Sequence, residues 1–146
     1  MPGNFDGKTA LVTGASSGIG RACAIAFAEK GAKVIVSDVD AAGGEETVRL
    51  IKAMNGEARF VICDVSKSSD VEALMRTAVQ SYSSLDFACN NAGIEGVSAA
   101  TADYPEEVWN RVISINLTGV WLCTKYEIQQ MPGGCGCLPC YRPEGG

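Results

Sequence analysis

Short apolar runs alternate with longer amphipathic segments along the first 90 residues of the chain. Four runs, rich in branched apolar residues and bounded by glycine or polar residues, have the length and composition of buried β-strands. They are Lys8–Thr13, Lys33–Ser37, Ala58–Cys63 and Leu85–Cys89. The pattern predicts four strands.

The segments between these runs carry apolar residues at helical spacing. The predicted helices are Gly18–Lys30, which ends at a glycine C-cap (Gly31), Ala41–Met54, and a segment from an N-cap at Ser68 or Ser69 to about Ser81. The expected inward residues are Ile19, Cys23, Ile25 (or Ala26) and Phe27 in the first helix, Val48 and Ile51 with Met54 as a further candidate in the second, and Val71, Leu74, Met75, Ala78 and Val79 in the third.

A long helix is predicted at Asp103–Met131, after a loop of small residues at Ala92–Ala102. Pro105 suits the first turn of this helix, and the acidic residues that follow it complement the helix dipole. Gly119 is a candidate for a kink. The helix carries many apolar residues, so we expect part of it to form an exposed apolar patch.

Strands that alternate with helices predict βαβ units, right-handed crossovers and a parallel sheet. The predicted fold class is α/β, a Rossmann-like parallel sheet of about four strands with flanking helices, over residues 1–131. The composition changes at Pro132, since the last fifteen residues hold five glycines, three prolines and three cysteines. We therefore expect 132–146 to be an irregular tail.

The composition excludes several classes of protein. The 146 residues are 47% apolar, and twelve basic against seventeen acidic residues give a formal charge of −5. The chain has no apolar run of the ~18–20 residues that span a bilayer, no secretory signal and no basic face for nucleic acid. We expect a cytoplasmic protein without a membrane or nucleic-acid partner.

The seven cysteines and the absence of histidine limit the metal and nucleophile chemistry. Cys23, Cys63, Cys89 and Cys123 each lie in an apolar segment and are expected to pack as small hydrophobes. The cluster Cys135, Cys137 and Cys140 could hold zinc or copper(I), but three ligands make an incomplete structural zinc site. The prediction is no metal, and no catalysis by imidazole.

A glycine-rich turn, Thr13–Gly20 (TGASSGIG), joins the first strand to the first helix. Gly14 allows a tight turn, Gly18 a close approach of the backbone to a phosphate, and Gly20 close packing of helix on strand. The helix N-terminus directs free N–H groups at the anion. Ser16 and Ser17 are expected either to bind phosphate or to cap the helix, and Ile19 to border the site.

Asp38 ends the second strand, eighteen residues after Gly20. A carboxylate at this place accepts hydrogen bonds from the adenosine ribose hydroxyls of a dinucleotide. It would repel a 2′-phosphate, and neither the glycine turn nor positions 39–40 supply a compensating Arg or Lys. The sequence therefore predicts NAD rather than NADP.

Together these motifs resemble the short-chain dehydrogenase/reductase family. Thr13–Gly20 is similar to its TGxxxGIG motif, Asp64-Val65 to the Asp-Val pair after the third strand, and Asn90–Gly93 to its NNAG motif. The resemblance implies that Asp64 and Val65 contact adenine, while Asn91, Ala92 and Gly93 line the nicotinamide side. It also implies that Asn116, in SINLTGV, holds a water of the family's proton relay.

The family's catalytic Tyr-x-x-x-Lys is missing from the 146 residues. Tyr82, Tyr104, Tyr126 and Tyr141 are followed four residues later by Asp86, Val108, Gln130 and Gly145, and the family's serine-bearing fifth strand is not recognisable. Lys125 and Tyr126 are adjacent, so their side chains diverge on a helix.

We therefore expect a truncated, NAD(H)-dependent member of this family, which by family acts on alcohols and ketones. The alternatives are a non-catalytic dinucleotide-binding module, a partner of full-length subunits, or an unstable product without function. The unpaired edge of the fourth strand and the apolar helix predict self-association.

Overall fold

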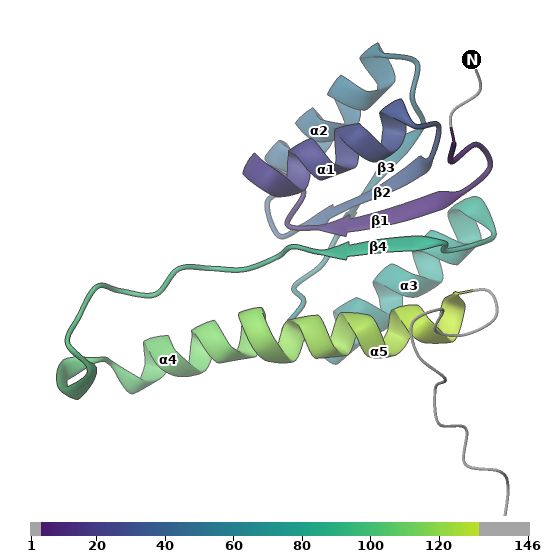
Figure 1. Ribbon diagram of the computed structural model, residues 1–146. Helices are drawn as coiled ribbons and strands as arrows, with labels where there is room; N and C mark the ends of the chain where they lie inside the picture. Colours follow the sequence, from purple (N-terminus) through teal and green to yellow (C-terminus); the bar gives the residue numbers. More distant parts are fainter. Residues whose placement is uncertain (1–3, 132–146) are drawn as a thin grey trace, which may run out of the picture.

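A four-stranded parallel sheet forms the centre of the computed structural model, which describes residues 4–131 (Figure 1). The strands are β1 (Thr9–Thr13), β2 (Lys33–Asp38), β3 (Ala58–Ile62) and β4 (Phe87–Asn90), in the order β3-β2-β1-β4. The helical elements are α1 (Gly18–Glu29), α2 (Ala41–Ala53), α3 (Ser68–Tyr82), the 3₁₀ turn η1 (Thr101–Asp103), α4 (Glu106–Ile113), the π-helical η2 (Ser114–Gly119) and α5 (Val120–Gln130). The predicted α/β fold with a Rossmann-like parallel sheet is confirmed.

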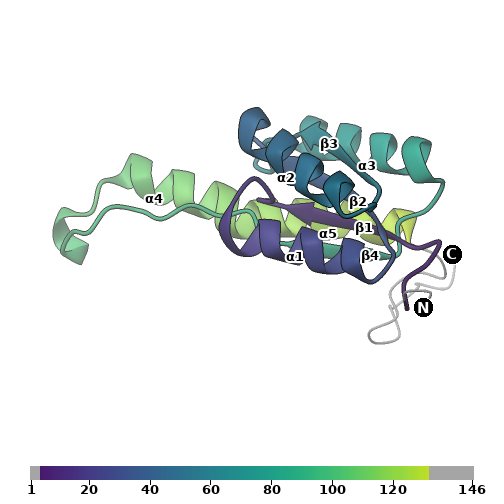
Figure 2. The same cartoon turned by 90° about the horizontal axis from the view of Figure 1, so that it is seen from above.

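Helices cover both faces of the sheet, with α1 and α2 on one face and α3 and α5 on the other (Figures 1 and 2). Successive residues of β1 therefore serve two different cores. Leu11 and its β2 partner Ile35 pack with residues of α3 and α5, whereas Val12 and its partner Val36 pack with residues of α1 and α2. Burial on both faces explains why these strands are continuous apolar runs.

Helix α1 approaches the sheet through small residues. Its buried residues are Gly20, Ala24 and Ala28, while the side chain of Ile19 is 75% exposed. The expectation that Ile19 faces inward was wrong. Small residues at i, i+4 and i+8 bring the helix close to the strands, and the large residue beside Gly20 turns out to solvent.

The last helical region begins later than predicted and does not break. Tyr104 is extended because it precedes Pro105, so α4 begins at Glu106 and not at Asp103. Gly119 is the last residue of the π-helical η2, which interrupts the regular α-helix between α4 and α5, and its backbone stays helical, so the chain continues directly into α5. A Cβ at Gly119 would lie 2.7 Å from Val65 Cγ2, so this glycine allows close approach to the β3–α3 turn.

Three smaller expectations also differ from the structure. The N-cap of α3 is Lys67 instead of Ser68 or Ser69, and Met54 is 38% exposed after the end of α2. The fourth strand starts at Phe87, although Leu85 before it is fully buried.

Strand β4 pairs with β1 only, within the part of the chain that the structure describes. All four of its residues are half-buried, whereas all five residues of β1 are buried. None of the helices in residues 4–131 has the length and apolar character to span a bilayer. The predicted irregular tail, 132–146, lies outside the described residues.

Candidate functional site

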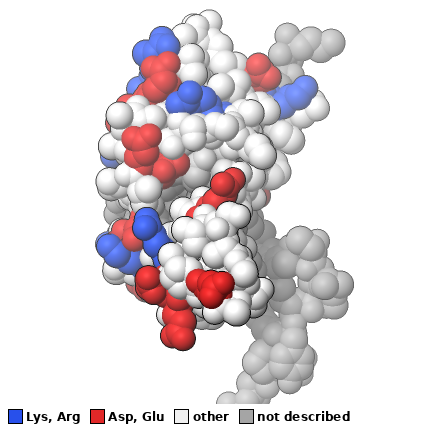
Figure 3. All heavy atoms as spheres, turned by 90° about the vertical axis from the view of Figure 1, so that its left-hand side faces the viewer, with Lys and Arg blue, Asp and Glu red and all other residues white. Residues whose placement is uncertain are grey.

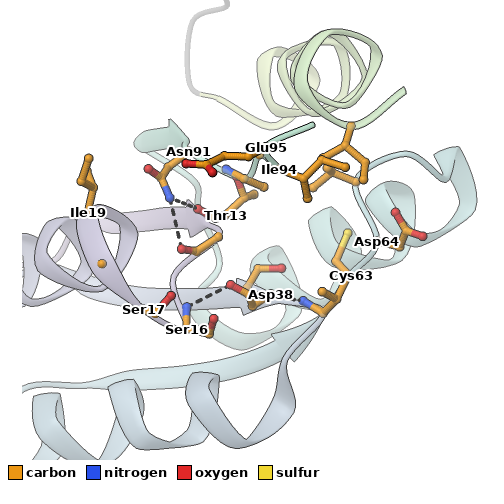
Figure 4. Close-up of a pocket in the computed structure, with 18 residues that line it drawn as sticks. Thr13, Ser16, Ser17, Ile19, Asp38, Cys63, Asp64, Asn91, Ile94 and Glu95 are labelled. Atoms are coloured by element: carbon orange, nitrogen blue, oxygen red, sulfur yellow. Dashed lines mark hydrogen bonds between the residues drawn. The ribbon is translucent and has the colours of Figure 1, made fainter. Parts of the chain in front are cut away.

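A cavity of about 640 Å³ opens at the carboxyl ends of the strands, the edge of the sheet where ligands of open α/β folds bind. It is formed by the β1–α1 turn, the end of β2, the β3–α3 turn and the loop after β4 (Figure 4). Figure 3 looks at this end of the molecule, where much of the surface is uncharged, with acidic side chains at several places around it. All the predicted cofactor-binding residues line the cavity except Gly20, which lies below it in α1.

Each of the three glycines of the turn is required for a different structural reason. Gly14 has φ +64°, and a Cβ there would lie 2.8 Å from both Ala92 Cα and Asn91 Nδ2. Gly18 has φ +53° and no atom within 4 Å of its Cβ position, so it borders open space. A Cβ on Gly20 would overlap the carbonyl oxygen of Gly14. Only Gly18 leaves room for a ligand to approach the backbone.

The N-terminus of α1 opens into this space. Ser17 occupies the N-cap position but makes no capping hydrogen bond through its side chain, and the first turn holds no acidic residue. Ser16 and Ser17 both line the cavity, although Ser16 is only 6% exposed. The first amides of a helix have no intrahelical acceptors, so this end of α1 suits an anion.

The Asp38 carboxylate is held in place by three backbone amides. Its Oδ2 accepts a hydrogen bond from Ser16 N at 3.0 Å, and its Oδ1 accepts from Val39 N at 2.7 Å and Asp40 N at 3.1 Å. The Asp38 carbonyl oxygen accepts from Cys63 N at 3.1 Å, which ties β2 to the end of β3 (Figure 4). A carboxylate has about four lone-pair positions, so acceptor capacity remains for a ligand.

Within residues 4–131, no Lys or Arg forms an ion pair with this carboxylate. None of the described residues that line the cavity is Lys or Arg. Arg21, in α1, donates from Nε to Thr47 Oγ1 at 2.9 Å and from Nη2 to the carbonyl oxygens of Ser16 and Gly43. Its guanidinium therefore joins α1 to α2.

The β3–α3 turn brings Asp64 and Val65 to the opposite wall. Asp64 Oδ1 accepts from Ser66 Oγ at 2.6 Å and Ser66 N at 3.1 Å, and these bonds lower the pKa of the carboxyl group. Burial raises the pKa of the Cys63 thiol to about 12. Cys63 is thus neutral near pH 7 and is not an activated nucleophile.

Asn91 joins the end of β4 to the glycine turn. Its Nδ2 donates to Thr13 O at 3.2 Å and Gly14 O at 3.1 Å, and Ala92 N donates to Thr13 Oγ1 at 3.1 Å. Asn90 points to the other side, where its Nδ2 donates to Glu127 of α5 at 2.8 Å.

Asn116 lies in the π-helical η2 and holds the loop after β4. Its Oδ1 accepts from Ile94 N at 2.8 Å, and its Nδ2 donates to Ile94 O at 2.9 Å. A π-turn inside a longer helix often marks a functional site.

A family model described as "short chain dehydrogenase" matches residues 8–136 of this chain. The chain belongs to the short-chain dehydrogenase family. The matching proteins include an uncharacterized oxidoreductase of Thermotoga maritima, 43% identical over 128 residues, and glucose 1-dehydrogenase 2 of Bacillus subtilis, 41% identical over 129 residues. Each alignment covers 88% of this chain and 50% of the relative.

Solved structures of the family agree with the fold. An NAD⁺-bound xylitol dehydrogenase matches with a TM-score of 0.85 at 35% identity, over 87% of this chain and 49% of that one. A short-chain dehydrogenase/reductase from Burkholderia phymatum in complex with NAD matches with a TM-score of 0.83 at 34% identity, over 87% and 45%. The chain therefore spans about half the length of these short-chain dehydrogenases.

Tyr126 and Lys125 do not line the cavity of this short-chain dehydrogenase fold. The Tyr126 hydroxyl donates to Glu72 Oε1 at 2.7 Å and shares a hydrogen bond with Ser68 Oγ at 3.0 Å, so it faces α3. Lys125 Nζ lies 5.4 Å from the Trp121 ring centre and 5.1 Å from that of Tyr126. Residues 4–131 hold no group of three His, Cys, Asp or Glu that could bind a metal, and Cys135, Cys137 and Cys140 lie outside them.

The sequence interpretation missed several residues that line the cavity. They are Thr13, Ser37, Val39, Cys63, Ile94, Glu95 and Ile115. Most of them directly neighbour a predicted site residue at the end of a strand, and this position was the available signal. Ile115 neighbours the predicted Asn116, but it reaches the cavity from η2 and not from the end of a strand.

Proposed function

We propose that this chain binds NAD(H) in the cavity and is the cofactor-binding half of an oxidoreductase of alcohols and ketones. The observation that carries the proposal is the Asp38 carboxylate, fixed by three backbone amides at the end of β2 in a cavity whose described lining has no basic residue.

We assign the parts of a dinucleotide to the cavity in the following order. The open space at Gly18 and the N-terminus of α1 would hold the pyrophosphate, and Asp38 would accept the adenosine ribose hydroxyls. Asp64 and Val65 would contact the adenine, and Asn91, Ala92 and Gly93 would border the nicotinamide side. The NAD present in two similar structures supports the class of ligand.

The choice of NAD over NADP rests on charge. A 2′-phosphate would approach the Asp38 carboxylate, and Arg21, the basic residue of the first turn of α1, is already bonded to three oxygen atoms of the protein. A like charge without a compensating cation disfavours binding.

Catalysis needs more than the cofactor site. The cofactor carries the hydride, and the protein must move the proton. No Tyr-x-x-x-Lys occurs in the 146 residues, and the Tyr126 hydroxyl is bonded to Glu72 and Ser68. Positioned acid–base help is worth ~10²–10⁴-fold, so we expect the chain alone to bind the cofactor without appreciable turnover. Asn116 remains a candidate for the proton relay.

A second candidate is a non-catalytic module that pairs with complete subunits. The observation that favours it is the exposed apolar surface of the last helical region, where Trp109, Leu117 and Trp121 are each more than half exposed. Turnover by the chain alone does not separate the two functions, because neither predicts it. Sedimentation of the chain mixed with a complete family member does, because a pairing module would form a mixed oligomer.

Calorimetric titration of the full chain with NAD⁺ and with NADP⁺ tests the cofactor assignment. We expect weak binding of NAD⁺ and weaker binding of NADP⁺. Tighter binding of NADP⁺ would contradict the role given to Asp38. Oxidation of any secondary alcohol at an ordinary enzymatic rate would contradict the expectation that the chain alone is inactive.

A further inference from the structure

A buried glutamate lies behind the cofactor site. Glu127, in α5, is 3% exposed, and its Oε2 accepts a hydrogen bond from Asn90 Nδ2 at 2.8 Å. Its Oε1 is buried without a hydrogen-bond partner, and Asn90 Oδ1 is in the same condition. Within residues 4–131, no Lys or Arg forms an ion pair with Glu127.

The two unpaired atoms are both acceptors, so the pair lacks one donor. The neighbouring hydroxyl of Thr124 does not supply it, because Thr124 Oγ1 donates to Val120 O at 2.8 Å. Buried polar groups are nearly always hydrogen-bonded, and a buried charge is normally paired. A proton on the carboxyl group of Glu127 would remove the charge and provide the missing donor.

We propose that Glu127 is a neutral carboxylic acid that positions the cofactor loop through a two-bond pair with Asn90. The Asn90 amide N–H donates to Oε2, and the acid O–H on Oε1 donates to Asn90 Oδ1. Glu127 lies outside the glycine turn, the Asp64-Val65 pair and the Asn90–Gly93 and Asn116 segments, and its effect on the loop rests on the proposed function.

Glu127 is connected to the cavity through two adjacent residues, Asn90 and Asn91. Asn90 ends β4, and the next residue, Asn91, bonds to the carbonyl oxygens of Thr13 and Gly14. Glu127 thus holds one side of the strand end while the glycine turn holds the other. Loss of the acid–amide pair would leave the Asn90 side chain with only its 3.4 Å contact to Thr124 Oγ1 on α5, and would loosen the loop that starts at Asn91.

The surroundings of Glu127 favour its neutral form. Burial raises the pKa of Glu127, against the opposing effect of the hydrogen bond from Asn90. On β4 and α5, the titratable groups beside Glu127 include the Cys89 and Cys123 thiols. Burial is the largest cause of the raised pKa of each thiol, and the charge of Glu127 is a smaller cause. On α3, Glu72 is bonded to the Tyr126 hydroxyl, and η2 carries no ionisable side chain.

The sign of the pH effect follows from the raised pKa. A carboxyl group whose pKa is higher in the folded than in the unfolded state contributes stability at pH values below the unfolded pKa. That contribution is lost as the pH rises through the folded pKa. Wild-type protein should therefore lose stability, and order in the loop, as Glu127 ionises.

The test compares the full chain with Glu127→Gln and Glu127→Leu. Glutamine offers an N–H donor and a C=O acceptor in place of the acid and does not titrate, whereas leucine offers neither. Glu45→Gln, on the exposed side of α2, is the matched control for removal of one carboxylate. Denaturant midpoints across the pH range measure the stability of each protein. The amide NMR shifts of residues 91–93 report the conformation of the loop after β4, and calorimetry gives the Kd for NAD⁺.

We expect Glu127→Gln to match wild type at low pH, to be more stable at high pH, and to lack the pH-dependent shifts of residues 91–93. The Kd of wild type for NAD⁺ should rise with pH, by up to about tenfold if binding shifts the pKa of Glu127 by one unit, and that of Glu127→Gln should not. Glu127→Leu should be destabilised at low pH.

The proposal is overturned if Glu127→Gln keeps the pH dependence of wild type, or if it is as destabilised as Glu127→Leu at low pH. If NAD⁺ binds to none of the proteins, the proposed function fails, while the midpoints and amide shifts still decide the state of Glu127.

Discussion

The two sides of β1 differ in how completely the described chain covers them. On the covered side, formed by β2, α1 and α2, the central residues of β2 are buried and α1 packs through glycine and alanine, although the edge strand β3 beyond β2 has only Ala58 buried. On the open side, formed by β4, the loop 91–105 and the helical region Glu106–Gln130, β4 is half-buried. An amphipathic pattern therefore identifies apolar residues but does not show whether the same chain covers them.

The cavity is lined by residues from both the covered side and the open side. The residues proposed for the pyrophosphate, ribose and adenine lie on the covered side or at its margin and are fixed by hydrogen bonds. The loop after β4 extends away from the sheet beside α4 (Figure 1) and is tied at Ile94 by Asn116. We therefore infer that the chain holds the adenosine half of the cofactor better than the nicotinamide half.

The largest expected effect is on stability and contrasts two leucines. Leu11→Ala removes a fully buried side chain from β1 and should lower the free energy of unfolding by about 2–5 kcal/mol. Leu117→Ala removes a side chain that is 63% exposed and should change it by less than about 0.5 kcal/mol. Denaturant unfolding measures both, and a large loss in Leu117→Ala would show that the open side is covered.

The next effect is on cofactor affinity. Asp38→Ala removes one hydrogen bond from the ligand to a charged acceptor, worth about 1.5–3 kcal/mol, so the Kd for NAD⁺ should rise by about 10- to 150-fold. Discrimination against NADP⁺ should fall as well. Asp40→Asn removes the same charge two residues away, at the N-cap of α2, and should leave the Kd unchanged in the same calorimetric assay. Equal effects of the two changes would contradict the assignment of Asp38.

Features that depend on neighbours in the sequence could be predicted from it. The glycine turn and Asp38 are local signals at the ends of strands. Asp38 and every predicted residue of the turn except Gly20 line the cavity. The later start of α4 was also readable, because Pro105 forces Tyr104 out of the helical region.

Features that depend on tertiary contacts could not be predicted. The outward turn of Ile19 follows from the packing of Gly20, Ala24 and Ala28 on the sheet. The bonds of Asn116 to Ile94 join residues 22 positions apart, and the burial of Glu127 depends on where β4 passes α5. No periodicity of apolar residues predicts a glutamate that is 3% exposed.

A smaller effect on stability, with a clear effect on association, is expected on the open side. Leu117→Ser with Trp121→Ser removes two exposed side chains one helical turn apart and should reduce self-association. The contact of Lys125 with Trp121 is lost, which should cost no more than about 0.5–1 kcal/mol. Sedimentation velocity under reducing conditions compares the variant with wild type, and a monomeric wild type at all concentrations would contradict the prediction.

The most direct test of the central claim is calorimetric titration of the full chain with NAD⁺, ADP-ribose and nicotinamide mononucleotide. ADP-ribose carries the adenosine, pyrophosphate and second ribose but lacks the nicotinamide. If the covered side provides most of the binding free energy, ADP-ribose binds within a few-fold of NAD⁺ and nicotinamide mononucleotide does not bind measurably. Binding of NAD⁺ that is more than about tenfold tighter than that of ADP-ribose, which equals about 1.4 kcal/mol, would contradict the account.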